Sequence, residues 1–263
     1  MRLKGRRVIM AAIALIGIGA LIFGSALVVS GFNPLELSRR VSGYEQRYAD
    51  LVGTFSRISI DDVDANIRIL PAENGKCRVI YDQTERSSYH IGIEDGALII
   101  EHNRSWLDSF GIIMSAPKLT VYLPEAEYKS LSVHAVSGSV QADGLDVKRA
   151  ELELTSGSIQ LNNMRIEGEA ALKTISGSIE LEGLRAGSLS ARTTSGAIRL
   201  NGVDAEALEL HSTSGSIRGE LLSGKVFEAS SVSGRISVPE SQPGAGICSA
   251  STTSGRITIS VAE

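Results

Sequence analysis

The stretches TSGSIQL (residues 155–161), ISGSIEL (175–181) and TSGAIRL (194–200) decide the fold of this chain. Each contains a Ser-Gly pair that is followed by alternating apolar and polar residues. Seven such pairs occur, and their glycines are 19 to 21 residues apart. The seven glycines are Gly138, Gly157, Gly177, Gly196, Gly215, Gly234 and Gly255. A fixed short period of this kind is typical of stacked structural repeats.

The positions around each Ser-Gly pair have the period of a β-strand. The third residue after the serine is apolar and β-branched in every repeat, from Val140 to Ile257. Apolar residues also recur four and six positions before the serine, so every second side chain faces inward. The inward parity changes at the Ser-Gly pair, which places a corner there. Glycine suits a corner because it adopts positive φ without a Cβ clash.

One coil of ~19 residues cannot bury its own apolar face, whereas stacked coils can. Equivalent strands of successive coils are then parallel, and such crossovers are right-handed in nearly all proteins. The sequence therefore predicts an all-β fold, a right-handed parallel β-helix (solenoid) with coils of 19–20 residues. Regular Ser-Gly coils are expected over residues 131–263, and irregular N-terminal β-coils over residues 55–130.

A basic and then apolar segment opens the chain. Its four basic residues are Arg2, Lys4, Arg6 and Arg7. The apolar part, residues 8–29, is long enough to cross a bilayer, which takes ~20 residues. The basic residues place the N-terminus in the cytoplasm. We expect residues 1–31 to be a cytoplasmic stub and a single transmembrane helix, with the remainder outside the cytoplasm at the cell membrane. The alternative is a cleaved signal peptide.

Residues 32–54 are predicted to form a short amphipathic helix. Asn33 is suited to cap a helix, and Pro34 to its first position. Apolar residues then follow at spacings of four and three, from Leu37 to Leu51. We expect this helix to cover the open N-terminal end of the solenoid, because a bare sheet edge invites pairing with another chain. The alternative is a short homotypic coiled coil.

Residues that carry chemistry recur in no pattern that defines an active site. Cys77 and Cys248 occupy apolar columns at opposite ends of the repeat, so we expect two buried free thiols and no disulfide. The four histidines lack metal-ligand spacing and are expected at the surface. They are His90, His102, His134 and His211. Asp61, Asp62 and Asp64 could bind calcium, but no glycine-rich calcium repeat accompanies them. We therefore expect no catalytic residue, no cofactor and no metal.

Four basic side chains are expected to project outward from neighbouring coils. They are Lys173, Arg192, Arg199 and Arg218. Glu153 and Glu180 are interspersed with them on the outer surface, so this surface is either a solvated ladder of mixed charge or a groove for an anionic polymer. We take these four residues as the candidate ligand face. The net charge of −4 gives no reason to expect nucleic acid as a partner.

In these repeats the chain resembles the bacterial putative-adhesin family, whose domains have no known function and consist of β-strand repeats. The resemblance rests on the TSGSI-x-L coils, on GALIIEHN (residues 96–103), on LTVYLPEAEYKSLSV (residues 119–133) and on the N-terminal anchor. It covers Phe55 to Ala262. The resemblance implies a bacterial cell-surface solenoid, often encoded near envelope-stress or regulatory genes, and it implies no catalytic residues.

The sequence favours a non-enzymatic, membrane-anchored surface module that binds or scaffolds in the manner of an adhesin. Its expected partners are the membrane and a cell-wall polymer, a glycan or an envelope protein. The alternative is an envelope-stress accessory that contacts a membrane sensor. A carbohydrate-active enzyme is disfavoured because the outward positions near the corner are mostly Ser and Thr. The last coil, GRITISVAE (residues 255–263), has no obvious cap. Its edge is either covered by a partner or blunted only by its short length and Glu263, so homo-oligomers through the solenoid ends or the helix are one hypothesis.

Overall fold

The computed structural model describes residues 44–84, 87–104 and 116–262. These residues form strands and turns without any helix, so this part of the chain offers no helical segment that could span a bilayer. The transmembrane helix expected over residues 1–31 lies outside the described residues. The strands are β1 (Glu45–Leu51), β2 (Arg57–Asp62), β3 (Asn66–Pro71), β4 (Cys77–Gln83), β5 (Ser87–Glu94), β6 (Ala97–Arg104), β7 (Lys118–Leu123), β8 (Glu127–Tyr128), β9 (Ser130–Ala135), β10 (Val140–Asp143), β11 (Asp146–Val147), β12 (Ala150–Ser156), β13 (Ile159–Asn162), β14 (Arg165–Ser176), β15 (Ile179–Glu182), β16 (Arg185–Ser195), β17 (Ile198–Ser212), β18 (Ile217–Leu221), β19 (Val226–Ser233), β20 (Ile236–Ser237), β21 (Ile247–Ser254) and β22 (Ile257–Val261).

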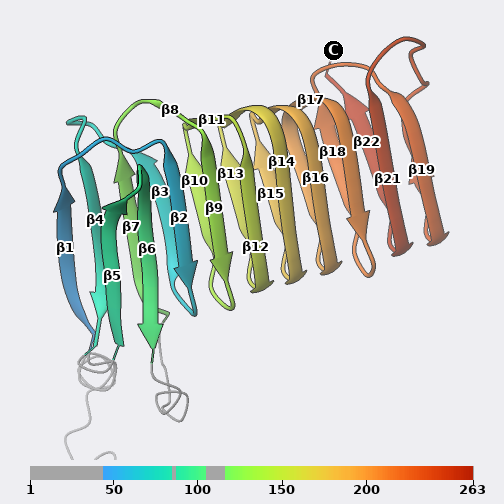
Figure 1. Cartoon of the computed structure of the whole chain (residues 1–263). Helices are drawn as coiled ribbons and strands as arrows, with labels where there is room; N and C mark the ends of the chain where they lie inside the picture. The colour runs from blue at the N-terminus through green and yellow to red at the C-terminus, as the bar shows by residue number, and fades with distance from the viewer. Residues whose placement is uncertain (1–43, 85–86, 105–115, 263) are drawn as a thin grey trace, which may run out of the picture. The chain divides into compact units, whose positions relative to one another are not determined.

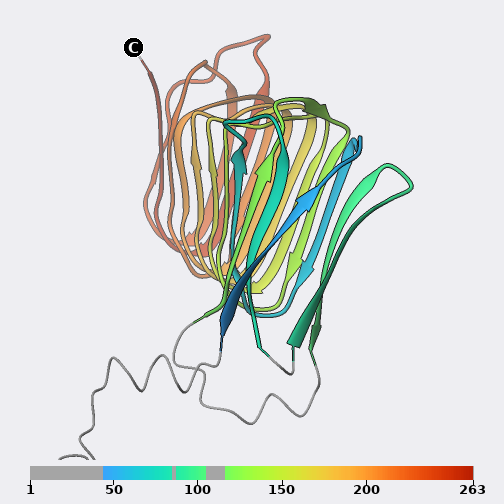
Figure 2. The same ribbon diagram turned by 90° about the vertical axis from the view of Figure 1, so that its left-hand side faces the viewer.

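Each regular coil has two long sides, which stack into two sheet faces. Face A contains β10, β13, β15, the start of β17, and β18. Face B contains β9, β12, β14, β16 and the end of β17. A short third side, made by β8, β11 and the starts of β14 and β16, joins A to B within a coil. Figure 1 shows the coils side by side, and Figure 2 looks along the stack into the space that the faces enclose.

The stacking is parallel and in register with the sequence repeat. On face A, Val140 pairs with Ile159, Ile159 with Ile179, and Ile179 with Ile198. The predicted parallel stacking of equivalent positions is therefore confirmed, and the described residues form an all-β solenoid. The right-handed winding stays a prediction.

The core lies between the faces and consists of the inward columns. Ile159 and Leu161 on face A, and Leu152 and Leu172 on face B, are at most 2% exposed. Burying one such side chain contributes about 1.5–3 kcal/mol, and the same columns repeat from coil to coil. Stability therefore comes from contacts between neighbouring coils, because no coil can enclose these side chains alone.

The last coil in the sequence is not the last coil in the stack. Strand β21 lies between β17 and β19 on face B, and β22 lies between β18 and β20 on face A. The coil of β19 and β20 therefore forms the open end, and our expectation that residues 255–263 form it was wrong. Ile236 shows the consequence. It belongs to the inward column in which Ile217 and Ile257 are fully buried, yet it is 40% exposed.

A buried lysine stabilises the turn through which the chain passes to the terminal coil. The Nζ of Lys225 donates to Asp204 Oδ1 at 3.1 Å and to Ser223 Oγ at 2.7 Å. The Lys225 side chain is 6% exposed, so its charge needs these partners. Partial burial raises the pKa of Asp204, but the contacts from Ser223 and Lys225 lower it by more, so the pKa lies below its usual value.

The first coil in the sequence is likewise inserted into the stack. Strand β2 lies between β6 and β9, and β3 lies between β7 and β10, in parallel pairings. Beyond them the parallel stack ends, because β5 pairs antiparallel with β6 on face B, and β4 pairs antiparallel with β7 on face A. The N-terminal end thus continues each face with antiparallel strands.

The prediction of an amphipathic helix over residues 32–54 was wrong for the part that the structure describes, from residue 44 onward. Residues Glu45–Leu51 form β1, which pairs antiparallel with β4 along its whole length. Asp50 lies opposite Arg78 and accepts from its Nε at 2.5 Å and its Nη2 at 2.9 Å. The same guanidinium lies over the ring of Tyr48, and its Cζ is 5.7 Å from the centroid of that ring. Without β1, the backbone groups along this edge of β4 would be unpaired. Pairing with β4 therefore determined the structure of residues 45–51 more strongly than the helical spacing of their apolar side chains.

The Ser-Gly pairs lie at the corners between faces B and A, as predicted, but positive φ explains only two of the seven glycines. Gly138 and Gly157 have φ of 98° and 138°. The reason that applies to all seven corners is the close approach of the backbone of the neighbouring coil. A Cβ placed on Gly177 would lie 1.9 Å from the carbonyl oxygen of Gly157, and a Cβ on Gly196 would lie 1.8 Å from that of Gly177. Glycine recurs because backbones approach too closely at this corner for any side chain.

Candidate functional site

One inward column runs beside the Ser-Gly corners, two positions before each serine, and we call it the corner column. In spatial order its members are Tyr89, His102, Asp62, Ala135, Leu154, Thr174, Thr193, Ser212, Thr252 and Ser231. The last five are hydroxyl residues. Each donates to a glycine carbonyl of the neighbouring coil, for example Thr193 Oγ1 to Gly177 at 2.9 Å. These bonds satisfy carbonyls in the tightest part of the corner.

At the N-terminal end the corner column carries three different polar side chains. Asp61 pairs with Glu101, so the residues that follow them, Asp62 and His102, lie side by side. His102 in turn pairs with Tyr89 across the antiparallel strands β5 and β6. The two rings stack with centroids 4.5 Å apart and planes 8° from parallel. A polar cluster thus occupies the place that hydroxyls occupy further along the stack.

Asp62 is the centre of this cluster. Its Oδ1 accepts from the amides of Asp64 at 2.9 Å and Ala65 at 2.8 Å, and its Oδ2 accepts from the Tyr89 hydroxyl at 2.6 Å. The side chain has no exposed surface. Burial raises the pKa of Asp62, but the contacts from His102, Tyr89 and the Ala65 amide outweigh it, so the pKa lies below its usual value. The same environment raises the pKa of Tyr89, by burial first and by the Asp62 charge second.

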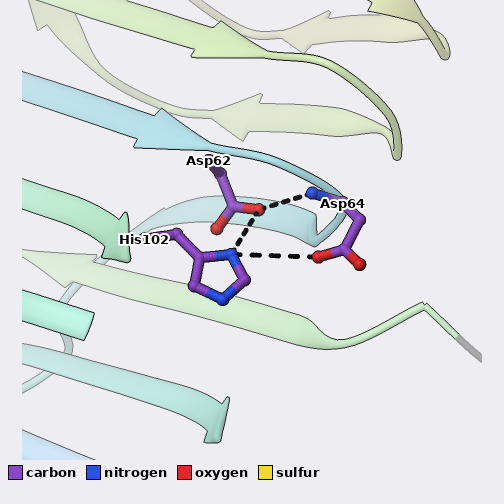
Figure 3. Close-up of side chains that lie close together, drawn as sticks. All are labelled: Asp62, Asp64 and His102. Carbon is purple, nitrogen blue, oxygen red and sulfur yellow. Dashed lines mark hydrogen bonds and ion pairs between the residues drawn. The ribbon is translucent and has the colours of Figure 1, made fainter. Parts of the chain in front are cut away.

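His102 and Asp64 complete the cluster (Figure 3). The Nδ1 of His102 lies 3.6 Å from Asp62 Oδ1 and 3.8 Å from Asp64 Oδ1. The His102 side chain is 4% exposed, and neither of its ring nitrogens has a hydrogen-bond partner among the described residues. Its predicted position at the surface was therefore wrong. Asp62, Asp64 and His102 each offer one possible ligand atom, and these three atoms all lie within 4.8 Å of one another, as the ligands of one metal ion must.

A hollow of about 370 Å³ adjoins this cluster on the outer side of face B. It is lined by Asp61, Asp62, Val63, His102, His134, Ala135, Val136, Glu153 and Thr155. The Nδ1 of His134 lies 3.4 Å from Asp61 Oδ1, and both side chains are about half exposed. The hollow thus lies beside the buried Asp62 and His102 and beside an exposed pair of the same residue types.

The four basic residues predicted as one ligand face lie on two faces. Lys173 and Arg192 are neighbours on face B, whereas Arg199 and Arg218 are neighbours on face A. Three of them form ion pairs: Lys173 with Glu153 at 2.6 Å, Arg192 with Glu209 at 2.5 Å, and Arg199 with Glu180. Arg218 forms no ion pair with any described residue. The predicted ladder of mixed charge is therefore present on each face separately.

Face A carries a hollow of about 390 Å³ around its two arginines. The lining residues are Gln160, Asn162, Glu180, Leu181, Glu182, Arg199, Leu200, Asn201, Arg218, Gly219 and Glu220. Most of them come from two outward rows that cross β13, β15, β17 and β18. The side-chain oxygen of Asn162 is buried and has no hydrogen-bond partner in the described part of the chain. The hollow therefore contains the guanidinium of Arg218, which forms no ion pair with a described residue, and it adjoins a buried acceptor that has no hydrogen bond.

Both cysteines are buried free thiols, as predicted. Burial is the main cause that raises the pKa of Cys77 and of Cys248, each to about 11. A thiol with a raised pKa is a poor nucleophile at neutral pH. Both cysteines are therefore packing residues.

Sequence reasoning missed the cluster of Asp62, Asp64 and His102. The sequence analysis considered Asp61, Asp62 and Asp64 together as a possible calcium site. His102 follows Asp62 by some forty residues, and only the insertion of β2 beside β6 brings it to the aspartates. A signal was present in GALIIEHN, because its apolar alternation aligns with RISIDD of β2 and places His102 opposite Asp62.

The stacked faces and glycine corners show that the described part of the chain is an all-β solenoid with polar hollows on its outer surface. The chain belongs to the Toastrack DUF4097 family, whose model matches residues 55–263. The resemblance to a family of unknown function is thereby confirmed.

Several solved structures are similar to the chain at low identity. A putative adhesin from Bacteroides fragilis NCTC 9343 has a TM-score of 0.43 and 16% identity, over 83% of this chain and 97% of that one. A putative cell adhesion protein from Clostridium sporogenes ATCC 15579 has a TM-score of 0.36 and 11% identity, over 83% and 100%. A putative lipid binding protein from Parabacteroides distasonis ATCC 8503 has a TM-score of 0.33 and 13% identity, over 82% and 96%. No curated protein matches the chain.

Proposed function

We propose that the chain is a membrane-anchored, extracytoplasmic binding module that holds a polar polymer, such as a cell-wall polymer or another glycan, against face A. The observation that carries this proposal is the face A hollow, where amide, carboxylate and guanidinium groups from several coils line one open space. Concave sites with a few convergent polar groups are the usual form of a binding site. The proposed role is non-enzymatic and adhesin-like.

The spacing of the coils suits a ligand with a repeating structure. Equivalent side chains on adjacent strands are ~4.8 Å apart, so Gln160, Glu180, Arg199 and Arg218 present hydrogen-bonding groups at short, regular intervals. A linear polymer can engage several of these groups at once, and linked weak contacts increase the overall affinity. None of the described residues that line the hollow is aromatic, so we expect hydrogen bonds and charge to provide recognition, without ring stacking.

Two groups in the hollow define the chemistry of the ligand. The guanidinium of Arg218, which has no ion pair among the described residues, suits a carboxylate, because the two groups match in bidentate geometry. The buried oxygen of Asn162 accepts from a hydroxyl or amide donor. The lining carboxylates disfavour a densely anionic polymer. We therefore expect a hydroxyl-rich chain that bears carboxylates at intervals.

Binding by the full chain in non-ionic detergent to an array of cell-wall polymers and glycans tests this proposal. The double variant Arg199→Ser/Arg218→Ser removes both cations of face A, and Lys173→Ser/Arg192→Ser is the matched control on face B. We expect the face A variant to bind at least tenfold more weakly and the face B variant to bind within twofold of the wild type. Equal losses in both variants would contradict the proposal. Absence of binding to every polymer would favour the accessory role at a membrane sensor.

The membrane anchor and the orientation are separate parts of the proposal. They are supported by the basic residues that precede the long apolar segment of residues 8–29. Ser237 is exposed, whereas both native cysteines are buried. We expect a cysteine introduced by Ser237→Cys to react in intact cells with a membrane-impermeant maleimide, with the wild type as the unlabelled control. Labelling only after cell lysis would contradict an extracytoplasmic solenoid.

A further inference from the structure

We propose that Asp62, Asp64 and His102 form a binding site for one divalent cation, with Zn²⁺ as the best match. The site lies at the N-terminal end of the corner column and does not depend on the face A hollow. Each residue provides one ligand atom, and the three atoms lie within 4.8 Å of one another. Figure 3 shows the imidazole Nδ1 facing both carboxylates.

The distances within the cluster are those of ligands around an ion. The Nδ1 of His102 is 3.6 Å from Asp62 Oδ1 and 3.8 Å from Asp64 Oδ1. Direct hydrogen bonds between such atoms are about 2.7–3.2 Å long. Tetrahedral zinc, with bonds of about 2.0–2.1 Å, separates its ligands by roughly 3.4 Å. The three side chains are therefore too far apart for direct hydrogen bonds, although His102 lies within ion-pair distance of both carboxylates. Their ligand atoms are nearly in place to bond one cation.

The burial of His102 is the second observation that indicates a ligand. Its side chain is 4% exposed, and neither ring nitrogen makes a hydrogen bond to a described residue. A buried polar group without a hydrogen bond is destabilising, so this imidazole is expected to have another partner besides the two carboxylates at ion-pair distance. The nitrogen that faces the carboxylates is the one a metal would take.

Neighbouring groups fix the positions of Asp62 and His102, as hydrogen-bonding neighbours fix the ligands of known metal sites. Asp62 is fixed by the Tyr89 hydroxyl at 2.6 Å and by the Asp64 and Ala65 amides. The Tyr89 ring stacks on His102 and fixes the plane of the imidazole. Ligating carboxylates are themselves hydrogen-bonded in most metal sites. The adjoining hollow, which Asp62 and His102 line, lies between the cluster and solvent.

The donor set selects the kind of metal. One imidazole with two carboxylates is a ligand set that zinc accepts, with a fourth position left for water. Calcium takes six to eight oxygen ligands, and magnesium binds mainly oxygen and water. We therefore expect Zn²⁺ to bind at least a hundredfold more tightly than Ca²⁺ or Mg²⁺.

The test is a titration of the metal-free full chain in non-ionic detergent with Zn²⁺, in competition with a chromogenic chelator. The site variants are His102→Gln and Asp64→Asn. The matched controls are His134→Gln and Asp61→Asn, because they change the neighbouring exposed pair of the same residue types. We expect one Zn²⁺ per wild-type chain, at least tenfold weaker binding in each site variant, and binding within twofold of the wild type in each control.

Three results would overturn the proposal: no zinc binding by the wild type, equal losses in site and control variants, or tighter binding of Ca²⁺ than of Zn²⁺. A spectroscopic measurement on the wild type removes the dependence on variants that fail to fold. X-ray absorption of the zinc-loaded chain should show one nitrogen ligand from imidazole among oxygen ligands. A shell of oxygen alone would place the ion elsewhere and refute the site.

Discussion

The corner column has different roles in the two halves of the solenoid. In the regular half, five hydroxyls each donate to a glycine carbonyl of the next coil, as Thr193 does to Gly177. In the irregular half, the same column contains Tyr89, His102 and Asp62, which contact one another. The strand alternation of the repeat directs the side chain of the corner column inward in both halves. Where no glycine carbonyl accepts its hydrogen bond, a polar side chain of this column contacts other polar side chains of the column instead.

The two halves also differ in how they tolerate bulk at the corner. In the regular half, glycine follows glycine through the stack, and each would clash with the carbonyl of its neighbour if it carried a Cβ. In the coil of β2 and β3, the corner contains Asp64 and Ala65 in place of Ser-Gly, and the Asp62 carboxylate accepts both amides. Side-chain hydrogen bonds thus stabilise a corner that has no glycine.

The largest expected effect is that of a methyl group in the regular corner. Gly196→Ala places a Cβ 1.8 Å from the carbonyl oxygen of Gly177, so neighbouring coils must separate. We expect the free energy of unfolding to fall by more than about 3 kcal/mol, measured by urea denaturation of the full chain in detergent. Gly92→Ala is the control, because its nearest atom is Glu94 Oε1 at 3.8 Å. Equal losses in the two variants would mean that corner glycines are not needed for close approach.

A smaller loss is expected when the acceptor of the irregular corner is removed. Asp62→Ala leaves the Ala65 amide and the Tyr89 hydroxyl buried without a partner, which costs about 2–3 kcal/mol. The measurement is urea denaturation with EDTA present, so that bound metal does not contribute to stability. Asp62→Asn keeps an acceptor and should recover part of the loss. A loss below that of Thr193→Val would show that the polar cluster does not stabilise this corner.

The smallest effect is expected from one hydroxyl of the regular column. Thr193→Val keeps the shape of the side chain but removes the donor to Gly177, and we expect a loss of about 1 kcal/mol in the same denaturation assay. Thr194→Val changes the exposed neighbour and should remain within about 0.5 kcal/mol of the wild type. Equal effects would indicate that the hydroxyl ladder contributes no stability, and that the column differs between the halves only in shape.

The regular coils could be predicted from the sequence because the relevant forces are local and repeated. Alternating apolar residues and Ser-Gly pairs specify which side chains face inward and where the chain turns, and seven copies of the pattern leave little ambiguity. Glycine was predicted correctly at the corner, but the predicted reason, positive φ, applies to only two of the seven corner glycines. Positive φ is a property of one residue, whereas the approach of the Gly177 carbonyl to Gly196 belongs to two stacked coils.

The helix predicted over residues 32–54 failed for a similar reason. The apolar spacing from Leu37 to Leu51 fits a helix, but the same residues can also form a strand, and pairing with β4 decided the outcome for Glu45–Leu51. Intrinsic preference is a weak determinant when a neighbouring strand offers a full set of hydrogen bonds.

The sequence by itself therefore determined the all-β class, the length of a coil, the inward columns and the two buried thiols. Only the tertiary structure decided the order in which the coils stack at each end, and with it the open edge at Ile236 and the meeting of His102 with Asp62. The physical reason is that every coil offers nearly the same apolar columns to its neighbours. Local alternation cannot rank one neighbour above another, whereas the packing of the whole stack can.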